Sequence, residues 1–301
     1  AEISGVVDDK GDADLTRWIE LATTEQGVDL KQYVRDAVWP SAALKKLTSQ
    51  SIEVTPEDIR KACGEAIEKG LKYILANRRP DGSIVDKDGM VVNYRTSIAT
   101  RALIAIDAKK YKDVIDAAVK YTKGIQVNDP KNKLRHGSIG YGASKDMGDQ
   151  MNMQEAIEML RKAGVSPDDP VFKRSLEFLM RTQALDEGAD PGVRTANDGG
   201  AIYRSDHTAE GASKAGMLQL PDGTMVPRSY GGATYALLKS LLFAGLKKDH
   251  PRVVAAYNWI RRNYSVKEHP GLGVKGLFYY QYTMARTLEL WGSQTIKVGN
   301  T

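Results

Sequence analysis

Two polar residues, Asp149 and Asn152, stand one helical turn apart where a glycine-rich stretch gives way to a helical pattern. Side chains three positions apart lie on one face of a helix, so both would present polar groups to the same space. A carboxyl and an amide placed in this way could serve in proton transfer or hold a polar group of a ligand. The alternative interpretation, which the pattern favours, is that Asp149 caps the helix. His136 and Arg228 complete the set of candidate catalytic residues.

Tyrosines are the second group of candidate functional residues. Several stand near the predicted starts of helices or in the loops that flank them. A lining of such rings would bind an apolar ligand, and the ring faces would also attract a cation. The same rings would serve equally well as core. The candidate ligand-binding residues are Tyr94, Tyr141, Tyr203, Tyr230, Tyr279 and Tyr280.

Histidines and acidic residues give no pattern typical of a metal site. Acidic residues between Asp186 and Glu210 lie in a glycine-rich stretch, but their spacing matches no calcium loop and indicates a solvated loop. The histidines show no His-x-x-x-His spacing, and the chain has a single cysteine, Cys63. The sequence therefore predicts no metal ion and no cofactor. The histidines in question are His136, His207, His250 and His269.

The elements that position these residues are helices in four weakly similar units. Each unit joins an amphipathic helix to a more apolar one through a glycine-rich loop. The first helices begin near residues 57, 111, 170 and 250, and an insertion at about 185–227 lengthens the third unit. Thr55-Pro56-Glu57-Asp58 gives the first start a cap, a proline at the first position and acids in the first turn. The second helices are predicted near residues 94–108, 150–163, 230–244 and 276–291.

The second helices carry less charge than the first, so we place them inside and the first helices outside, in a double ring or arc. Their starts then gather at one end of a shared axis, which brings Tyr94, Asp149, Tyr230 and Tyr280 together. The predicted fold is all-α, an α/α toroid of about four helical hairpins over residues 56–301. Residues 1–55 are predicted to be a helical extension packed on the repeats, since their few apolar residues cannot build a core of their own.

Composition limits the classes of function. Hydrophobic residues make up 42% and charged residues 27% of the 301 residues, which is ordinary for a globular protein. No apolar run approaches the ~20 residues that cross a bilayer. The formal net charge is +5, but the basic residues are scattered in pairs, so nucleic-acid binding is not indicated. The oligomeric state is left open.

Three motifs carry a resemblance to known families: Arg79-Pro80-Asp81-Gly82-Ser83, Asn197-Asp198-Gly199-Gly200 and Phe278-Tyr279-Tyr280-Gln281-Tyr282-Thr283-Met284-Ala285-Arg286. With the repeats over roughly residues 56–293, they resemble the squalene-hopene cyclase and protein prenyltransferase beta-subunit repeat families. The resemblance implies an α/α toroid whose aromatic lining stabilises carbocations. Many relatives look exported and the chain starts at Ala1, so a periplasmic or secreted location is expected.

The chain departs from both families at the residues that do their chemistry. The cyclases protonate an alkene with an Asp-x-Asp-Asp set, whereas the matching stretch here is Asp149-Gln150-Met151-Asn152, with Met151 in the place of the acid. The prenyltransferases use a zinc site of aspartate, cysteine and histidine. Here Cys63 lies in the first outer helix, and Tyr279-Tyr280-Gln281 stands where the histidine is expected. Neither activity is therefore expected.

Three hypotheses for function follow. The first is a cyclase-like repeat protein that binds an apolar or isoprenoid-like ligand, or a protein partner, at its tyrosine-rich end. The second is an enzyme of altered terpenoid-cyclase-like chemistry that uses Asp149, Asn152, His136 and Arg228. The third is a non-catalytic scaffold. A central cavity of roughly several hundred Å³ with converging polar groups would favour a ligand, and a solid core would favour the scaffold.

Overall fold

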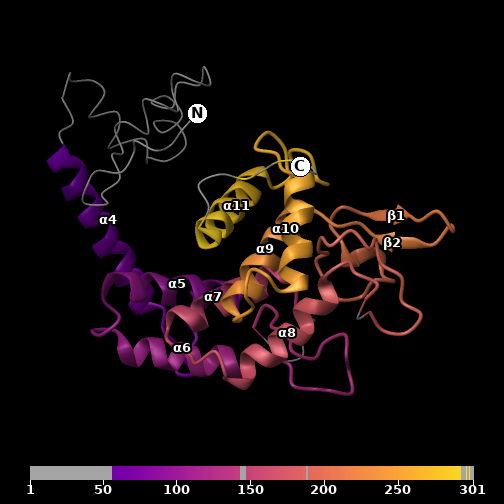
Figure 1. Ribbon diagram of the computed structural model, residues 1–301. Helices are drawn as coiled ribbons and strands as arrows, with labels where there is room; N and C mark the ends of the chain where they lie inside the picture. The colour runs from indigo at the N-terminus through magenta and orange to yellow at the C-terminus, as the bar shows by residue number, and fades with distance from the viewer. Residues whose placement is uncertain (1–55, 143–146, 188, 293–295, 297, 299–301) are drawn as a thin grey trace. The chain divides into compact units, whose positions relative to one another are not determined.

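The computed structural model describes residues 56–142, 147–187, 189–292, 296 and 298. The chain divides into two compact units, Ala1–Glu68 and Lys69–Thr301. Helix α4 (Pro56–Ala76) begins in the first unit and ends in the second (Figure 1). The predicted cap at Thr55 and the predicted extension 1–55 lie outside the described residues. The other helices of the described residues belong to the second unit.

Four helices of the second unit form an inner row in chain order. They are α5 (Val92–Asp107), α7 (Gln150–Lys162), α9 (Gly231–Phe243) and α11 (Leu277–Trp291), and each packs against the next (Figure 1). Side chains of the two end helices also meet, since Arg101 of α5 and Arg286 of α11 both pair with Glu158 of α7. The row is therefore curved. The second helix of each predicted unit lies inside, as the toroid prediction requires.

The outer helices cover the inner row. Helix α6 (Lys112–Gly124) packs on α5 and α7, α8 (Pro170–Thr182) packs on α7 and α9, and α10 (Pro251–Arg262) packs on α9. Two of these helices begin with proline after a capping side chain. The Asp169 carboxylate accepts from Val171 N at 3.0 Å, and His250 Nδ1 accepts from Arg252 N at 3.2 Å. The predicted all-α fold of paired helices in two layers is confirmed.

The core lies mainly around α7 and α9. Every residue from Gly231 to Leu241 of α9 is buried, because α7, α10 and α11 all pack against this helix. A smaller cluster joins α5 and α6 through Leu103, Tyr111 and Ile115. None of the helices in the described ranges is long and apolar enough to span a membrane.

The insertion contains more structure than the predicted loop. It forms a short helix, η1 (Glu210–Ala212), and a hairpin of β1 (Met217–Gln219) and β2 (Met225–Pro227) around the Pro221-Asp222-Gly223 turn. Its acidic residues are not simply solvated either. The Asp198 carboxylate accepts from Gly200 N, Ser229 Oγ and Trp259 Nε1 at 2.8–3.0 Å, so it fastens the insertion to α10.

Candidate functional site

Helix α7 is polar in sequence but buried in the structure. All its residues from Asn152 to Leu160 are buried, and they include Gln154, Glu155 and Glu158. Buried polar side chains require hydrogen-bond or charge partners. These partners come from α5, α9 and α11, so one helix face gathers groups from the whole inner row.

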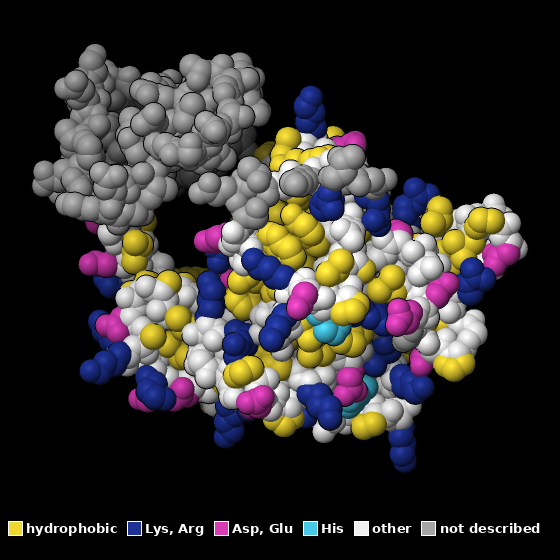
Figure 2. Space-filling view, in the orientation of Figure 1, with side chains coloured by type: hydrophobic (Ala, Val, Ile, Leu, Met, Phe, Trp, Pro, Cys, Tyr) yellow, Lys and Arg dark blue, Asp and Glu magenta, His cyan; other side chains and the backbone are white. Residues whose placement is uncertain are grey.

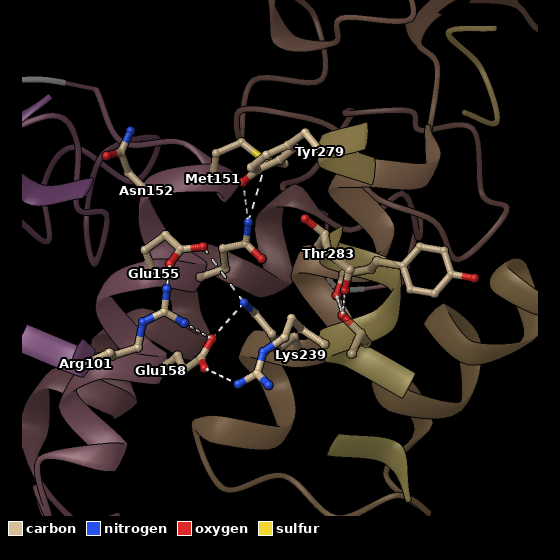
Figure 3. Close-up of polar contacts among 12 residues, drawn as sticks. Arg101, Met151, Asn152, Glu155, Glu158, Lys239, Tyr279 and Thr283 are labelled. Atoms are coloured by element: carbon tan, nitrogen blue, oxygen red, sulfur yellow. Dashed lines mark hydrogen bonds and ion pairs between the residues drawn. The ribbon is translucent and has the colours of Figure 1, made fainter. Parts of the chain in front are cut away.

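Glu158 is the centre of an ion network that also contains Arg101, Glu155, Lys239 and Arg286 (Figure 3). Its Oε2 atom accepts from Lys239 Nζ at 2.9 Å and pairs with Arg101 Nη1 at 2.6 Å, and its Oε1 atom accepts from Arg286 Nη2 at 3.3 Å. Glu155 pairs with Arg101 and lies 4.0 Å from Lys239 Nζ. The side chains of both carboxylates are 1% exposed. We call these five residues the central ion network.

The central ion network keeps Glu158 ionised. Burial alone would raise the pKa of Glu158, but the neighbouring cations Lys239 and Arg101 lower it to about 2. The ordinary value for this carboxyl is 4.5, so its contribution to stability is present above about that pH and is lost as the pH falls towards 2. An ionised carboxylate that pairs with four cations, Lys162 as well as Arg101, Lys239 and Arg286, is not available as a general acid.

Unpaired polar atoms lie beside the central ion network. Gln154 Nε2 donates to the Tyr279 hydroxyl at 2.6 Å, which leaves Gln154 Oε1 without a hydrogen-bond partner among the described residues (Figure 3). Glu155 Oε1 and Thr283 Oγ1 are also buried without such a partner. Burial, followed by the charge of Glu155, raises the pKa of Tyr279, so its hydroxyl stays protonated. The unpaired atoms are thus two acceptors, Gln154 Oε1 and Glu155 Oε1, and one hydroxyl, Thr283 Oγ1.

Exposed apolar side chains border the same place. Tyr94 and Ile98 of α5 share a helix face with Arg101, and Ile98 is 39% exposed. Tyr282 of α11 is 48% exposed and stands one turn before Arg286. Hydrophobic side chains gather on the surface where α11 lies (Figure 2). Polar atoms in the interior and apolar rings at the surface thus meet between α5 and α11.

Asp149 caps α7. Its Oδ1 atom accepts from Met151 N and Asn152 N at 2.9 Å, and its Oδ2 atom accepts from Asn152 Nδ2 at 2.9 Å. Asn152 in turn accepts from Asn93 Nδ2 of α5 at 3.3 Å. These contacts are those of an N-cap, which is the interpretation that the sequence favours. Asp149 and Asn152 do lie together, and they join the starts of α5 and α7.

Three of the predicted tyrosines lie near Asp149. The hydroxyls of Tyr141 and Tyr203 are 3.0 Å apart. Burial, followed by the charge of Asp149, raises the pKa of Tyr203 and also that of Tyr230. Tyr230 is 2% exposed, and its hydroxyl has no hydrogen-bond partner among the described residues.

The remaining candidates lie elsewhere. His136 Nε2 is 3.4 Å from Glu177 of α8, and Arg228 is exposed beside β2. Tyr280 is fully buried and stacks on His269 with ring centroids 4.7 Å apart. Three of the predicted tyrosines, Tyr203, Tyr230 and Tyr280, are therefore members of the hydrophobic core, and both Tyr230 and Tyr280 contact the His269 ring.

Sequence reasoning missed the central ion network. Arg101, Glu155 and Glu158 look like the solvated face of an amphipathic helix when each helix is considered alone. Lys239 was the available signal, because it stands inside the apolar stretch Tyr235-Ala236-Leu237-Leu238-Lys239-Ser240-Leu241. A buried lysine needs an acidic partner.

His269 is held neutral in the core, and this predicts a pH-dependent stability. Gly232 N donates to Nε2 at 2.7 Å, and Nδ1 donates to the Lys275 carbonyl at 3.0 Å. Burial lowers the pKa of His269 below its usual 6.5. The stability that the neutral ring provides is therefore complete above about pH 6.5 and is lost as the pH falls through the lowered value. We expect His269→Ala to reduce the free energy of unfolding by about 2–4 kcal/mol at pH 7.5, from the lost hydrogen bond and ring contacts.

Urea denaturation of the wild type and of His269→Ala at pH 7.5 and 5.5 measures this effect. The difference between the two proteins should shrink at pH 5.5. His250→Asn is the control, since asparagine keeps the cap of α10. A difference between wild type and His269→Ala that is equal at both pH values would contradict the prediction.

The hollows among the described residues include a partly open cavity of about 40 Å³ at the base of the insertion and a groove of about 510 Å³ between the end of α4 and α6. Neither is lined by the central ion network or by the predicted tyrosines. Within the described ranges, no group of three or more histidine, cysteine, aspartate or glutamate side chains is placed to hold a metal ion.

Solved structures similar to the chain include two of one terpene cyclase. One is an arginine-to-alanine variant of the type II terpene cyclase MstE from Scytonema, in complex with its substrate geranylgeranyl dihydroxybenzoate. It shares 14% identity at a TM-score of 0.48, over 76% of this chain and 59% of the cyclase. The other is the same cyclase without ligand, with 15% identity and a TM-score of 0.46 over 76% of this chain and 60% of the cyclase. The chain thus spans about three fifths of the length of these proteins. No family model and no curated protein matches the sequence.

Proposed function

We propose that the chain binds an elongated apolar ligand with a polar end, such as an isoprenoid alcohol, where α5 and α11 approach each other beside α7. The apolar part of the ligand contacts Tyr94, Ile98 and Tyr282. Its polar end pairs with Gln154 Oε1 and Thr283 Oγ1. Binding, rather than cyclisation, is the function that these groups support.

The observation that carries the proposal is the meeting of unpaired buried polar atoms with exposed rings at one place. A buried polar atom without a partner costs about 1–3 kcal/mol, so a ligand hydroxyl that pairs with it recovers much of that energy. The rings add apolar contact and accommodate a chain without requiring one shape. Apolar walls with a few convergent polar groups are typical of small-molecule sites.

The residues around the start of α7 do not support proton-initiated cyclisation. Met151 has no proton to give, and both oxygens of Asp149 are occupied by hydrogen bonds from the first turn of α7. Glu158 is held as an anion by the central ion network. Incubation with squalene and with geranylgeraniol, followed by mass spectrometry of the extract, is expected to return the unchanged compounds.

Native mass spectrometry and calorimetry with geranylgeraniol test the proposal. The wild type should bind one molecule saturably. Tyr282→Ala should weaken binding roughly tenfold, because the loss of about 1.4 kcal/mol of ring contact changes an affinity by that factor. Tyr73→Ala is the matched control, since Tyr73 is a 59% exposed tyrosine on α4. The proposal fails if the wild type shows no saturable binding, or if both variants bind as tightly as the wild type.

A protein-binding scaffold is the second candidate function, and one observation favours it. Val274, in the turn before α11, is 80% exposed, and Phe278, in the first turn of α11 and one turn before Tyr282, is 75% exposed. Exposed apolar side chains that lie together are typical of contact surfaces. If geranylgeraniol does not bind, Phe278→Asp should abolish the association of the chain with a protein partner isolated from the source cells, and Tyr73→Asp should not.

A further inference from the structure

Three segments meet at the cavity of about 40 Å³ at the base of the insertion: the loop after α6, the end of α8 with the loop that follows it, and the middle of the insertion. The end of α8 contributes Arg181 and Gln183, and the loop after it contributes residues such as Asp190. Leu134 comes from the loop after α6, and His207 comes from the middle of the insertion. The contact between His207 and α8 therefore joins two parts of the chain that are not neighbours in sequence.

His207 holds the insertion to α8 as a neutral ring. Its Nε2 atom lies 2.8 Å from the carbonyl oxygen of Arg181, and because a carbonyl only accepts, Nε2 carries the proton. Nδ1 is buried and has no hydrogen-bond partner among the described residues. The whole residue is 6% exposed. A second proton at Nδ1 would place a charged N–H in this cavity without a protein acceptor, which is costly.

The charged groups around His207 partly oppose one another. Arg181 of α8 lines the same cavity, and burial lowers the pKa of its guanidinium, so a second cation there is unfavourable. Asp206, Asp186 and Asp198 favour a charged ring, but burial is the larger effect and lowers the pKa of His207. Asp186 also accepts from Thr195, and Asp190 pairs with Lys133. Each of these two carboxylates is therefore already engaged.

We infer that His207 is a pH-sensitive latch that holds the insertion closed on α8 when neutral and releases it when protonated. The ring and the Arg181 carbonyl form the latch. On protonation the ring leaves the cavity for water, and the insertion moves with it. The latch does not depend on the proposed ligand.

Release of the insertion would affect the contacts of Tyr203, which stands four residues before His207 in the chain. The Tyr203 carbonyl accepts from Gln150 N at 3.0 Å, at the first residue of α7. The Tyr203 hydroxyl oxygen lies 3.0 Å from the hydroxyl oxygen of Tyr141. When the insertion opens, both contacts break, and the cap region around Asp149 becomes accessible to water.

Hydrogen exchange followed by mass spectrometry tests the latch on the full chain without ligand. At pH 5.5 compared with pH 7.5, after correction for the intrinsic rate, peptides within residues 199–212 should exchange up to about tenfold faster in the wild type, because a released ring with the ordinary pKa of 6.5 is mostly protonated at pH 5.5 and mostly neutral at pH 7.5. Peptides of α9 should not change by the same factor. In His207→Gln the side chain still donates to the Arg181 carbonyl but cannot gain a charge, so the pH effect should vanish. His136→Gln, at another buried histidine, should keep it.

The latch is overturned if residues 199–212 exchange equally at both pH values in the wild type, if α9 opens to the same extent, or if His207→Gln keeps the pH effect. Should His207→Gln not fold, the titration of His207 in the labelled wild type by nuclear magnetic resonance decides the question. A midpoint at or above the ordinary 6.5 would also overturn it.

Discussion

Glu158→Gln is expected to lower the free energy of unfolding by about 3–5 kcal/mol at pH 7. The substitution removes the charge that Arg101, Lys239 and Arg286 share and leaves these cations without it. The Lys239 side chain is 2% exposed and cannot turn to water without opening the core. Removing one partner of a buried ion pair is costly because the other charge stays buried. Urea denaturation, followed by circular dichroism, measures the effect.

Glu289→Gln is the matched control for Glu158→Gln. Glu289 also pairs with Arg286, but its side chain is 67% exposed, so solvent screens the pair. Its loss should lower the free energy of unfolding by less than about 1 kcal/mol. If the two substitutions have the same effect, the central ion network contributes no more than a surface pair, and its role in joining the inner helices is refuted.

Gly137→Ala is expected to have the second large effect. Gly137 has a φ of +82°, in the left-handed region, and a Cβ atom there would overlap the backbone carbonyl of Arg174 in α8. The left-handed conformation costs an alanine about 1–2 kcal/mol, and the overlap with a packed helix adds about 1–3 kcal/mol. The free energy of unfolding should therefore fall by about 2–5 kcal/mol, measured by urea denaturation.

Gly223→Ala separates the cost of the left-handed backbone conformation from the cost of the overlap with α8. Gly223 has a φ of +86°, but a Cβ atom there would meet nothing within 4 Å. The two glycines thus share the backbone strain, and the overlap belongs to Gly137 alone. Gly223→Ala should cost about 1–2 kcal/mol, and the difference between the variants measures the overlap. Equal losses would mean that α8 yields to the added methyl group.

The helices could be predicted because their signals are local. The first turns of α8 and α10 follow Asp169-Pro170 and His250-Pro251, where a cap and a proline stand together. The assignment of inner and outer layers followed from charge, and α9, with its buried stretch Gly231–Leu241, bears it out. The hairpin β1–β2 was missed because its strands have three residues each, too few for an alternating pattern.

The polar site could not be predicted in the same way. Glu158 depends on Lys239, which lies 81 positions away, and Arg101 meets Glu155 across 54 positions. A helical pattern records which residues share a face, but not which faces meet. Each acidic residue therefore looked like an ordinary surface residue.

The tyrosines of α11 also show that a helical pattern does not tell which helix faces meet. Tyr279 hydrogen-bonds Gln154 beside the polar face of α7, whereas its neighbour Tyr280 is fully buried against His269. Consecutive residues of a helix point in different directions, so only the placement of α11 decides which ring belongs to the site. The sequence placed tyrosines at the start of α11, and tertiary packing decides which ring contacts the polar face of α7.

The central ion network also ties together helices that are not adjacent. Arg286 of α11 reaches Glu158 of α7, although α9 lies between them in the row. In an open helical array each module touches only the next, so modules can be duplicated or deleted during evolution. Here the deletion or duplication of one module would move Arg286 away from the Glu158 carboxylate. A charge in the interior would then lose its partner. We therefore expect the central ion network to oppose a change in the number of modules and to leave connections such as the insertion between α8 and α9 freer to vary.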